Sequence, residues 1–335
     1  MRKGIGWISA AVGGLLCCVS CLPVWAATPD VLPVERFTAA PAFTAPLLSP
    51  DGRHLAVGVD MGEGQHALQI FGVEGMQRTA VLRLPRYDQV YDMRWVSDER
   101  LVVAKAKRYG SLEAPWPTGE ILATNADGTQ QAYIYGYEQA NTAAGLDRGF
   151  GELVGVARER DGRIYLRQRQ RNETRSALYE VQTIGRPRFR LHAQINVPSM
   201  HFVLDPAGVA RFAHGRDTDG ALVLHTSADG LRWQAVANPR VQPISVLADG
   251  AQALAWHYDG QWRRSLAWVD LDGKVLKVLA SDAAFDLGGL EWPQDGYMPF
   301  LARVQGGREA VSYLAPETPE AVFHRNLSAQ MPGKH

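Results

Sequence analysis

The stretch Leu47-Leu48-Ser49-Pro50-Asp51-Gly52-Arg53-His54-Leu55-Ala56-Val57 carries a complete β-hairpin signal. Its Asp-Gly pair supplies the positive φ that a tight turn requires, and the residues on both sides alternate between apolar and polar. One hairpin of this kind is common in proteins, but this pattern recurs along the chain. The fold is therefore predicted from the repetition rather than from any single copy.

Five further copies of the strand–turn–strand pattern follow, at residues 93–103, 154–166, 202–208, 244–250 and 290–296. The later turn glycines, Gly162, Gly208, Gly250 and Gly296, are 46, 42 and 46 residues apart. Gly52 and Gly162 are 110 residues apart, which is two periods plus an insertion that we place at Tyr109–Thr118. The spacing indicates one structural unit about every 45 residues.

A second hairpin signal lies inside several of these units, at Asn125–Gly128, Ser227–Gly230 and Asp270–Gly273. Two hairpins per unit give four strands, and four-stranded units at this spacing are typical of propeller blades. The sequence therefore predicts an all-β fold, a β-propeller of four-stranded blades over residues 47–326, with six blades detected. A β-sandwich is the alternative, and it fits poorly with so many units of nearly equal length.

The N-terminus has the three parts of a bacterial export signal. Arg2 and Lys3 precede an uncharged apolar run, Ile5–Leu22, and small residues at Val24 and Ala26 are typical of cleavage after Ala26. We expect a signal peptide at 1–26, a lead segment at 27–46 and a C-terminal tail at 327–335, with the protein periplasmic or secreted. An uncleaved anchor, or a lipoprotein modified at Cys21, is the alternative.

The composition excludes several classes of function. Lys and Arg together number 35 and equal the 35 Asp and Glu, which argues against nucleic-acid binding through the phosphate backbone. All three cysteines, Cys17, Cys18 and Cys21, lie in the export segment. The mature chain is therefore expected to form no disulfide and no thiolate metal site, and no cofactor or membrane span is predicted for it.

Three ordered stretches resemble the N-terminal propeller of bacterial prolyl oligopeptidase-family serine peptidases of the dipeptidyl- and acylaminoacyl-peptidase type. They are Leu48–Ala56, Arg94–Val103 and Gly119–Thr129, and the resemblance extends over roughly residues 31–333. In that family the propeller gates and positions peptides for a following α/β-hydrolase domain. The family's ring is also expected to need seven or more blades, so the resemblance implies an incomplete ring here.

The resemblance does not extend to catalysis. No serine of the sequence lies in the Gly-x-Ser-x-Gly pattern of a nucleophile elbow, and the alternating α/β pattern of a hydrolase is missing. We therefore expect no enzyme activity and no catalytic, cofactor or metal residues, and a truncated or separately encoded peptidase propeller that contacts a peptide or protein partner. The alternative is an independent periplasmic TolB-like propeller that binds a protein.

Three side-chain patterns are candidates for a site. Arg167, Arg169 and Arg171 alternate within an arginine-rich stretch; the preferred interpretation is a solvated, charged edge strand, and the alternative is a grip for an anion or a carboxylate. Ser227–Trp233 nearly matches the Asp-box of sialidase-like propellers but is expected to be only a hairpin turn. His257 near Asp259 is interpreted as an ordinary turn or blade-face histidine.

Overall fold

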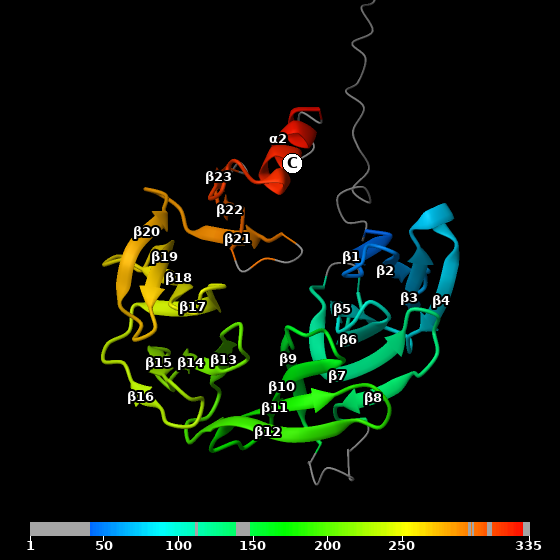
Figure 1. Ribbon diagram of the computed structural model, residues 1–335, viewed down its shortest axis with the longest axis horizontal. Helices are drawn as coiled ribbons and strands as arrows, with labels where there is room; N and C mark the ends of the chain where they lie inside the picture. Colours follow the sequence, from blue (N-terminus) through cyan, green and yellow to red (C-terminus); the bar gives the residue numbers. More distant parts are fainter. Residues whose placement is uncertain are drawn as a thin grey trace, which may run out of the picture. The chain divides into compact units, whose positions relative to one another are not determined.

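The computed structural model describes residues 41–110, 113–138, 148–293, 296, 298–306 and 310–330. The expected signal peptide and most of the lead segment lie outside these residues. The described residues form a six-bladed β-propeller, and Figure 1 shows the sheets following one another in chain order around the molecule. No helix among them is long and apolar enough to cross a membrane.

Each of the first three blades is a four-stranded antiparallel sheet whose strands pair in chain order. Blade 1 consists of β1 (Phe43–Leu48), β2 (His54–Asp60), β3 (His66–Gly72) and β4 (Arg78–Arg83), with the short 3-10 helix η1 (Glu74–Met76) between the last two. Blade 2 consists of β5 (Asp88–Trp95), β6 (Arg100–Lys107), β7 (Trp116–Asn125) and β8 (Ala132–Tyr135). Blade 3 consists of β9 (Phe150–Val156), β10 (Arg163–Arg169), β11 (Ser176–Gln182) and β12 (Arg188–Ile195).

Blades 4 and 5 repeat the four-stranded pattern, and blade 6 departs from it. Blade 4 consists of β13 (His201–Leu204), β14 (Ala210–Arg216), β15 (Leu222–Thr226) and β16 (Gln234–Ala235). Blade 5 consists of β17 (Val241–Val246), β18 (Gln252–Tyr258), β19 (Arg264–Asp270) and β20 (Val275–Ala280). Blade 6 has three strands among the described residues, β21 (Leu287–Glu291), β22 (Leu301–Val304) and β23 (Ala310–Tyr313).

The repeated turns have the backbone geometry that the sequence predicts. Gly52 and Gly208, in the first and fourth copies, have φ of 72° and 82°, in the left-handed region that favours glycine. Ser49 Oγ accepts the N–H of His54, so the residue before the turn closes the hairpin. At Gly208 the packing is also tight, because a Cβ there would lie 2.2 Å from the hydroxyl of Tyr165.

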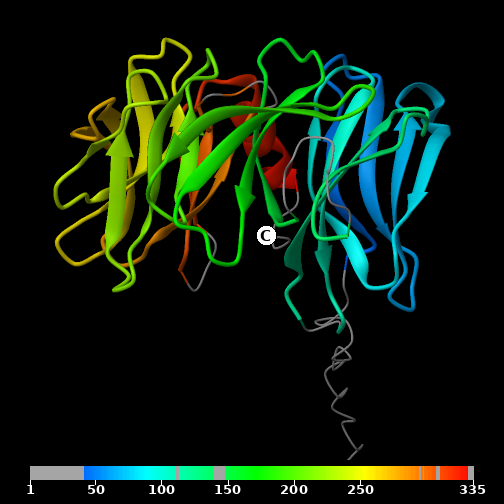
Figure 2. The ribbon, with the colours of Figure 1, turned by 90° about the horizontal axis from the view of Figure 1, so that it is seen from below.

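The two faces of the propeller differ in their connections. The turn face, where each innermost strand ends, carries the tight turns at 49–53, 96–99, 157–162, 205–209 and 247–251. The opposite loop face, where each innermost strand begins, carries the less regular connections, including 108–115, 170–175 and the links between blades. Figure 2 shows the blades edge-on with connections along both faces. Residues 111 and 112 of the expected insertion at Tyr109–Thr118 lie outside the described residues, while its other residues follow β6 on the loop face and the last of them belong to β7.

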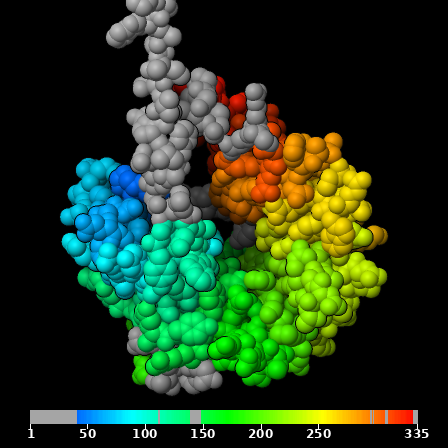
Figure 3. Space-filling view, turned by 180° about the vertical axis from the view of Figure 1, so that it is seen from behind, coloured from blue at the N-terminus to red at the C-terminus, as the bar shows by residue number. Residues whose placement is uncertain are grey.

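The hydrophobic core lies between consecutive blades, which are arranged around a central hollow (Figure 3). Each cluster combines residues of two neighbouring sheets, as with Trp95 and Ile70 between blades 1 and 2, or Phe212 and Val246 between blades 4 and 5. Among the described residues there are five such clusters, joining blade 1 to 2, 2 to 3, 3 to 4, 4 to 5 and 5 to 6. Within the part of the chain that the structure describes, no cluster joins blade 6 to blade 1. Six blades are confirmed, and a ring of seven or more stays a prediction.

The propeller bounds differ from the expected 47–326 at both ends. The first described strand begins at Phe43, and the described residues end in helix α2 (Pro319–Gln330), which crosses the expected boundary between propeller and tail. Only Ala321 of α2 is buried, and the helix is attached to blade 6 by the hydrogen bond between the hydroxyl of Tyr313 and His324 Nδ1. The helix lacks an apolar stripe, so its apolar residues do not recur at the helical spacing by which a helix is recognised in a sequence.

Candidate functional site

Arg167 is not on a solvated edge strand, so that interpretation is wrong. Its strand, β10, is an inner strand of blade 3 and pairs with both β9 and β11. The side chain is 0% exposed, and its guanidinium forms ion pairs with Glu152 Oε2 at 3.0 Å and Glu173 Oε1 at 2.8 Å. The two carboxylates come from β9 and from the β10–β11 loop, so this arginine organises the loop-face end of blade 3.

The ion pairs continue into blade 4. The second oxygen of Glu152 accepts a hydrogen bond from His201 Nδ1 at 2.6 Å, and the His201 ring stacks on His214 at 5.6 Å. Burial acts to raise the pKa of Glu152, but the hydrogen bonds and charges of His201 and Arg167 outweigh it and lower that pKa to about 2. Burial lowers the pKa of His214 to about 4. At neutral pH Glu152 is therefore a carboxylate and His214 is uncharged.

The same network fixes the loop that follows β10. Glu173 Oε1 accepts the backbone N–H of Ser199 at 2.8 Å in addition to the Arg167 guanidinium, and Glu173 Oε2 accepts the N–H of Gln170 at 3.2 Å. Both carboxylate oxygens are thus engaged. The loop is held to β10, to its own backbone and to the start of blade 4.

A pocket of about 650 Å³ opens on the loop face beside this loop. We call it the loop-face pocket, and it is lined by Tyr137, Phe150, Arg169, Gln170, Arg171, Asn172, Glu173 and Ser199. Arg169 pairs with Phe150 across β10 and β9, and its guanidinium lies 5.2 Å from the centre of the Phe150 ring. This is a cation–π contact that orients the arginine side chain.

Buried charges of blade 2 support the other wall of the pocket. Glu120, 3% exposed, accepts the backbone N–H groups of Tyr137 at 2.8 Å and Glu138 at 3.3 Å, and burial raises the pKa of Glu120. Next to it, Lys105 Nζ lies 2.7 Å from Asp88 Oδ2, with both side chains almost fully buried. Burial acts to lower the pKa of Lys105, but the Asp88 and Glu138 charges raise it overall.

An axial pocket of about 340 Å³ opens at the turn face, among the ends of the innermost strands. Its walls include residues 154–156 of β9, 202–204 of β13 and 244–246 of β17, together with Arg94 and Arg158. Arg94 is paired with Asp92 at 3.2 Å. Strand ends and tight turns make most of this pocket.

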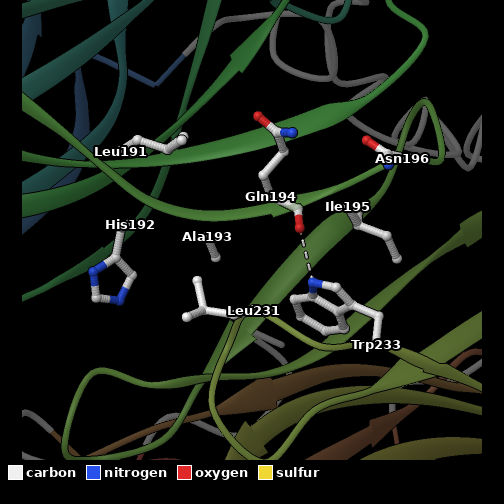
Figure 4. Close-up of a pocket in the computed structure, with 8 residues that line it drawn as sticks. All are labelled: Leu191, His192, Ala193, Gln194, Ile195, Asn196, Leu231 and Trp233. Carbon is white, nitrogen blue, oxygen red and sulfur yellow. Dashed lines mark hydrogen bonds between the residues drawn. The ribbon is translucent and has the colours of Figure 1, made fainter.

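A third pocket, of about 470 Å³, lies between the outer strand β12 and the β15–β16 connection (Figure 4). Trp233 Nε1 donates a hydrogen bond to the carbonyl oxygen of Gln194 at 2.9 Å, and His192 Nε2 lies 2.6 Å from the carbonyl oxygen of Gly208. Both polar groups connect blade 3 to blade 4, so this pocket is a junction between blades.

The Asp-box-like stretch is a hairpin turn, as expected. Ser227 Oγ accepts the N–H of Gly230 at 2.9 Å, and Asp229 Oδ1 accepts the N–H groups of Leu231 and Arg232. Trp233 comes just before β16 and packs against Phe202 of β13. These contacts close the turn and fasten it to the innermost strand of the same blade.

His257 and Asp259 do not form a pair, which agrees with the interpretation of an ordinary blade histidine. His257 Nδ1 lies 3.1 Å from Ser265 Oγ, and burial lowers the pKa of His257. Asp259 closes its own loop by accepting the N–H of Gln261 at 2.8 Å and pairs with Arg263 at 3.0 Å. Across the residues that the structure describes, no group of three or more His, Asp or Glu could hold a metal ion.

Sequence reasoning singled out the arginines of blade 3 but missed their carboxylate partners. These partners, Glu152 and Glu173, carry no motif and reach the site from a strand and from a loop. The buried Glu120, which holds the backbone of Tyr137, carries no motif either. The only signal in the sequence was the alternation of Arg167 and Arg169, which places them on one face of a strand.

The structure is similar to several solved β-propellers. A structure of two prolyl endopeptidases, studied for inter-domain dynamics in catalysis and specificity, matches 83% of this chain at 12% identity with a TM-score of 0.49. An acylaminoacyl peptidase from Pyrococcus horikoshii matches 86% at 12% identity with a TM-score of 0.44. The β-propeller domain of the Trilobed protease from Pyrococcus furiosus, described as having an open velcro topology, matches 83% at 11% identity with a TM-score of 0.46.

These likenesses concern the fold. The chain spans 43% and 47% of the first two structures and 84% of the isolated propeller domain. No family model matches the chain, and no curated protein matches it either.

Proposed function

We propose that this chain is the non-catalytic propeller of a prolyl oligopeptidase-type serine peptidase, and that it binds peptides and positions them for a hydrolase domain. One observation carries the proposal. The loop-face pocket presents Arg169, Arg171, Tyr137 and Phe150 on a scaffold fixed by buried ion pairs. Concave sites with a few well-placed polar groups among aromatic rings are suited to binding a ligand.

The arrangement of the faces supports a positioning role. The turns 49–53 and 247–251 of the turn face are closed by their own hydrogen bonds, whereas the loop 170–175 that lines the loop-face pocket lies on the opposite face. Functional side chains are most often carried by such loops on a rigid scaffold. Exposed aromatic side chains also gather on the loop-face connections: Tyr109, Trp116, Tyr137 and Trp262. Such rings suit contact with a peptide chain.

The described residues form propeller blades and one terminal helix, and the sequence lacks a nucleophile elbow. In this proposal a hydrolase domain, on another stretch of polypeptide, carries out the hydrolysis. That domain is also the partner that we expect the propeller to contact. The proposal includes export to the periplasm or the medium, on the strength of the N-terminal segment 1–26.

Two measurements test the proposal. Fluorescence anisotropy with labelled peptides of about ten residues should give saturable binding to the chain, while p-nitrophenyl esters and peptide anilides should not be turned over. The absence of binding to a varied peptide panel would refute the positioning role. Turnover that one Ser→Ala substitution removes would refute the non-catalytic assignment. A continuing reading frame downstream with a Gly-x-Ser-x-Gly pattern would support a truncated peptidase gene.

A further inference from the structure

The charge balance of the loop-face pocket favours an anionic ligand. Of its three charged side chains, Glu173 is already engaged, because Arg167 and two backbone N–H groups occupy its oxygens. Arg169 and Arg171 are exposed, and neither has an ion-pair partner in the described part of the chain. The pocket therefore presents two guanidinium groups without an ion-pair partner among the described residues, next to one carboxylate that is already hydrogen-bonded. Arginine forks match the geometry of a carboxylate, which can accept two parallel hydrogen bonds.

The Arg169 side chain and the loop that carries Arg171 are held in place before any ligand binds. Arg169 is the last residue of β10 and lies over the ring of Phe150, its partner across the sheet. Arg171 lies in the loop that Glu173 fastens to Gln170 and Ser199. A preorganised site loses less conformational entropy on binding than a mobile one.

The neighbouring side chains distinguish a peptide from a bare anion. Tyr137 is 49% exposed at the pocket, and Phe150 lines it from β9. These rings give apolar surface next to the guanidinium groups, while Asn172 and Ser199 offer hydrogen-bonding groups. A carboxylate that is attached to an apolar side chain or backbone fits this combination, whereas a small inorganic ion would leave the rings unused.

We propose that the loop-face pocket recognises a peptide carboxylate through Arg169 and Arg171. The inference rests on the proposed peptide binding and deepens it by naming the chemical group that is recognised. The carboxylate has two possible sources, the C-terminus of the peptide and an acidic side chain. Arg167 and Glu173 act as positioning residues, because they fix the loop and are already paired with each other.

The test compares three labelled peptides of one apolar sequence by fluorescence anisotropy. The first has a free C-terminus, the second has an amidated C-terminus, and the third is amidated and carries one internal Asp. The full chain is compared with Arg169→Gln/Arg171→Gln. Arg188→Gln is the matched control, since Arg188 is exposed and its strand β12 begins at the turn face. Circular dichroism melting confirms that each variant folds.

We expect the free acid to bind at least tenfold more tightly than the amide, and the double variant to lose that difference while Arg188→Gln keeps it. Recovery of binding by the internal Asp would identify an acidic side chain as the source, and no recovery would identify the C-terminus. Equal binding of all three peptides would overturn the carboxylate inference but leave peptide binding intact. Unchanged binding of the acid by the double variant would also overturn it. Absence of binding by any peptide would refute both proposals.

Discussion

Replacing Arg167 by Met should destabilise the protein more than any other single charge removal in blade 3. The guanidinium is 0% exposed and pairs with Glu173 at 2.8 Å and Glu152 at 3.0 Å. Methionine fills part of the volume but leaves Glu173, whose side chain is only 10% exposed, without its counter-charge. Breaking a buried ion pair by removing one partner costs about 3–5 kcal/mol. Proteins have about 5–15 kcal/mol of net stability, so the loss is a large fraction of the total.

Urea unfolding followed by circular dichroism measures this effect. With an m-value of about 3 kcal/mol per M, the midpoint of Arg167→Met should fall by at least about 1 M. Arg169→Met is the matched control, because Arg169 lies two residues later on the same strand but is exposed; it should cost less than about 1 kcal/mol. Adding Glu173→Gln to Arg167→Met should recover part of the loss, because no unpaired carboxylate then stays buried.

The reasoning would be refuted by a change below about 1 kcal/mol in Arg167→Met, or by equal losses in Arg167→Met and Arg169→Met. A double variant that is less stable than Arg167→Met would also contradict it. In that case the carboxyl of Glu173 would be stabilised mainly by its backbone hydrogen bonds with Gln170 and Ser199.

Three further predictions concern other parts of the molecule. The folded-state pKa of His214, about 4, is below its ordinary 6.5, so uncharged His214 contributes at most about 3 kcal/mol to stability above pH 6.5, and this contribution is lost as the pH falls towards 4. Urea titrations should show that His214→Phe flattens the pH dependence of stability between pH 6.5 and 4. The contribution of Glu152, whose pKa is about 2, is lost only below pH 4.5. Gly208→Ala should lower the thermal midpoint because of its positive φ and the Tyr165 hydroxyl, and Tyr165→Phe should restore only part of it; an unchanged midpoint would contradict the tight packing. Mass spectrometry of exported protein should find Ala27 as the first residue, and a mature chain that retains cysteine would refute the predicted cleavage.

The blade repeat was predictable because each turn is encoded locally. At Asp51-Gly52 the Asp51 side chain accepts the N–H of Arg53 and Gly52 has a positive φ. At the later turn the Asp270 side chain accepts the N–H groups of Asp272 and Lys274, and Gly273 has the positive φ. The sequence also holds a local signal for α2 that the search for apolar periodicity missed. Thr318 and Pro319 are a typical N-cap and first helical residue, and Thr318 Oγ1 accepts the N–H of Ala321 at 3.4 Å.

The candidate site could be predicted only in part, because it is assembled from distant segments. The alternation of Arg167 and Arg169 correctly placed them on one strand, but the burial of Arg167 depends on which strand lies at the edge of the blade. That order is fixed by the pairing of β10 with β9 and β11. The counter-charges of Arg167 come from Glu152, 15 residues away, and from the loop at Glu173.

Among the described residues, the five clusters between blades form, in energetic terms, a linear array with two ends. A central blade such as blade 3 shares apolar clusters with two neighbours, whereas blades 1 and 6 each share a cluster with one neighbour among the described residues. The stability of such an array is approximately the sum of the stabilities of the single blades and of the interfaces between neighbouring blades. Local unfolding therefore starts at the end blades and moves inward. Amide hydrogen exchange should consequently be slowest in blades 3 and 4 and fastest at β1 and β23. The Arg167 network, in the middle of the array, lies where the scaffold opens least often.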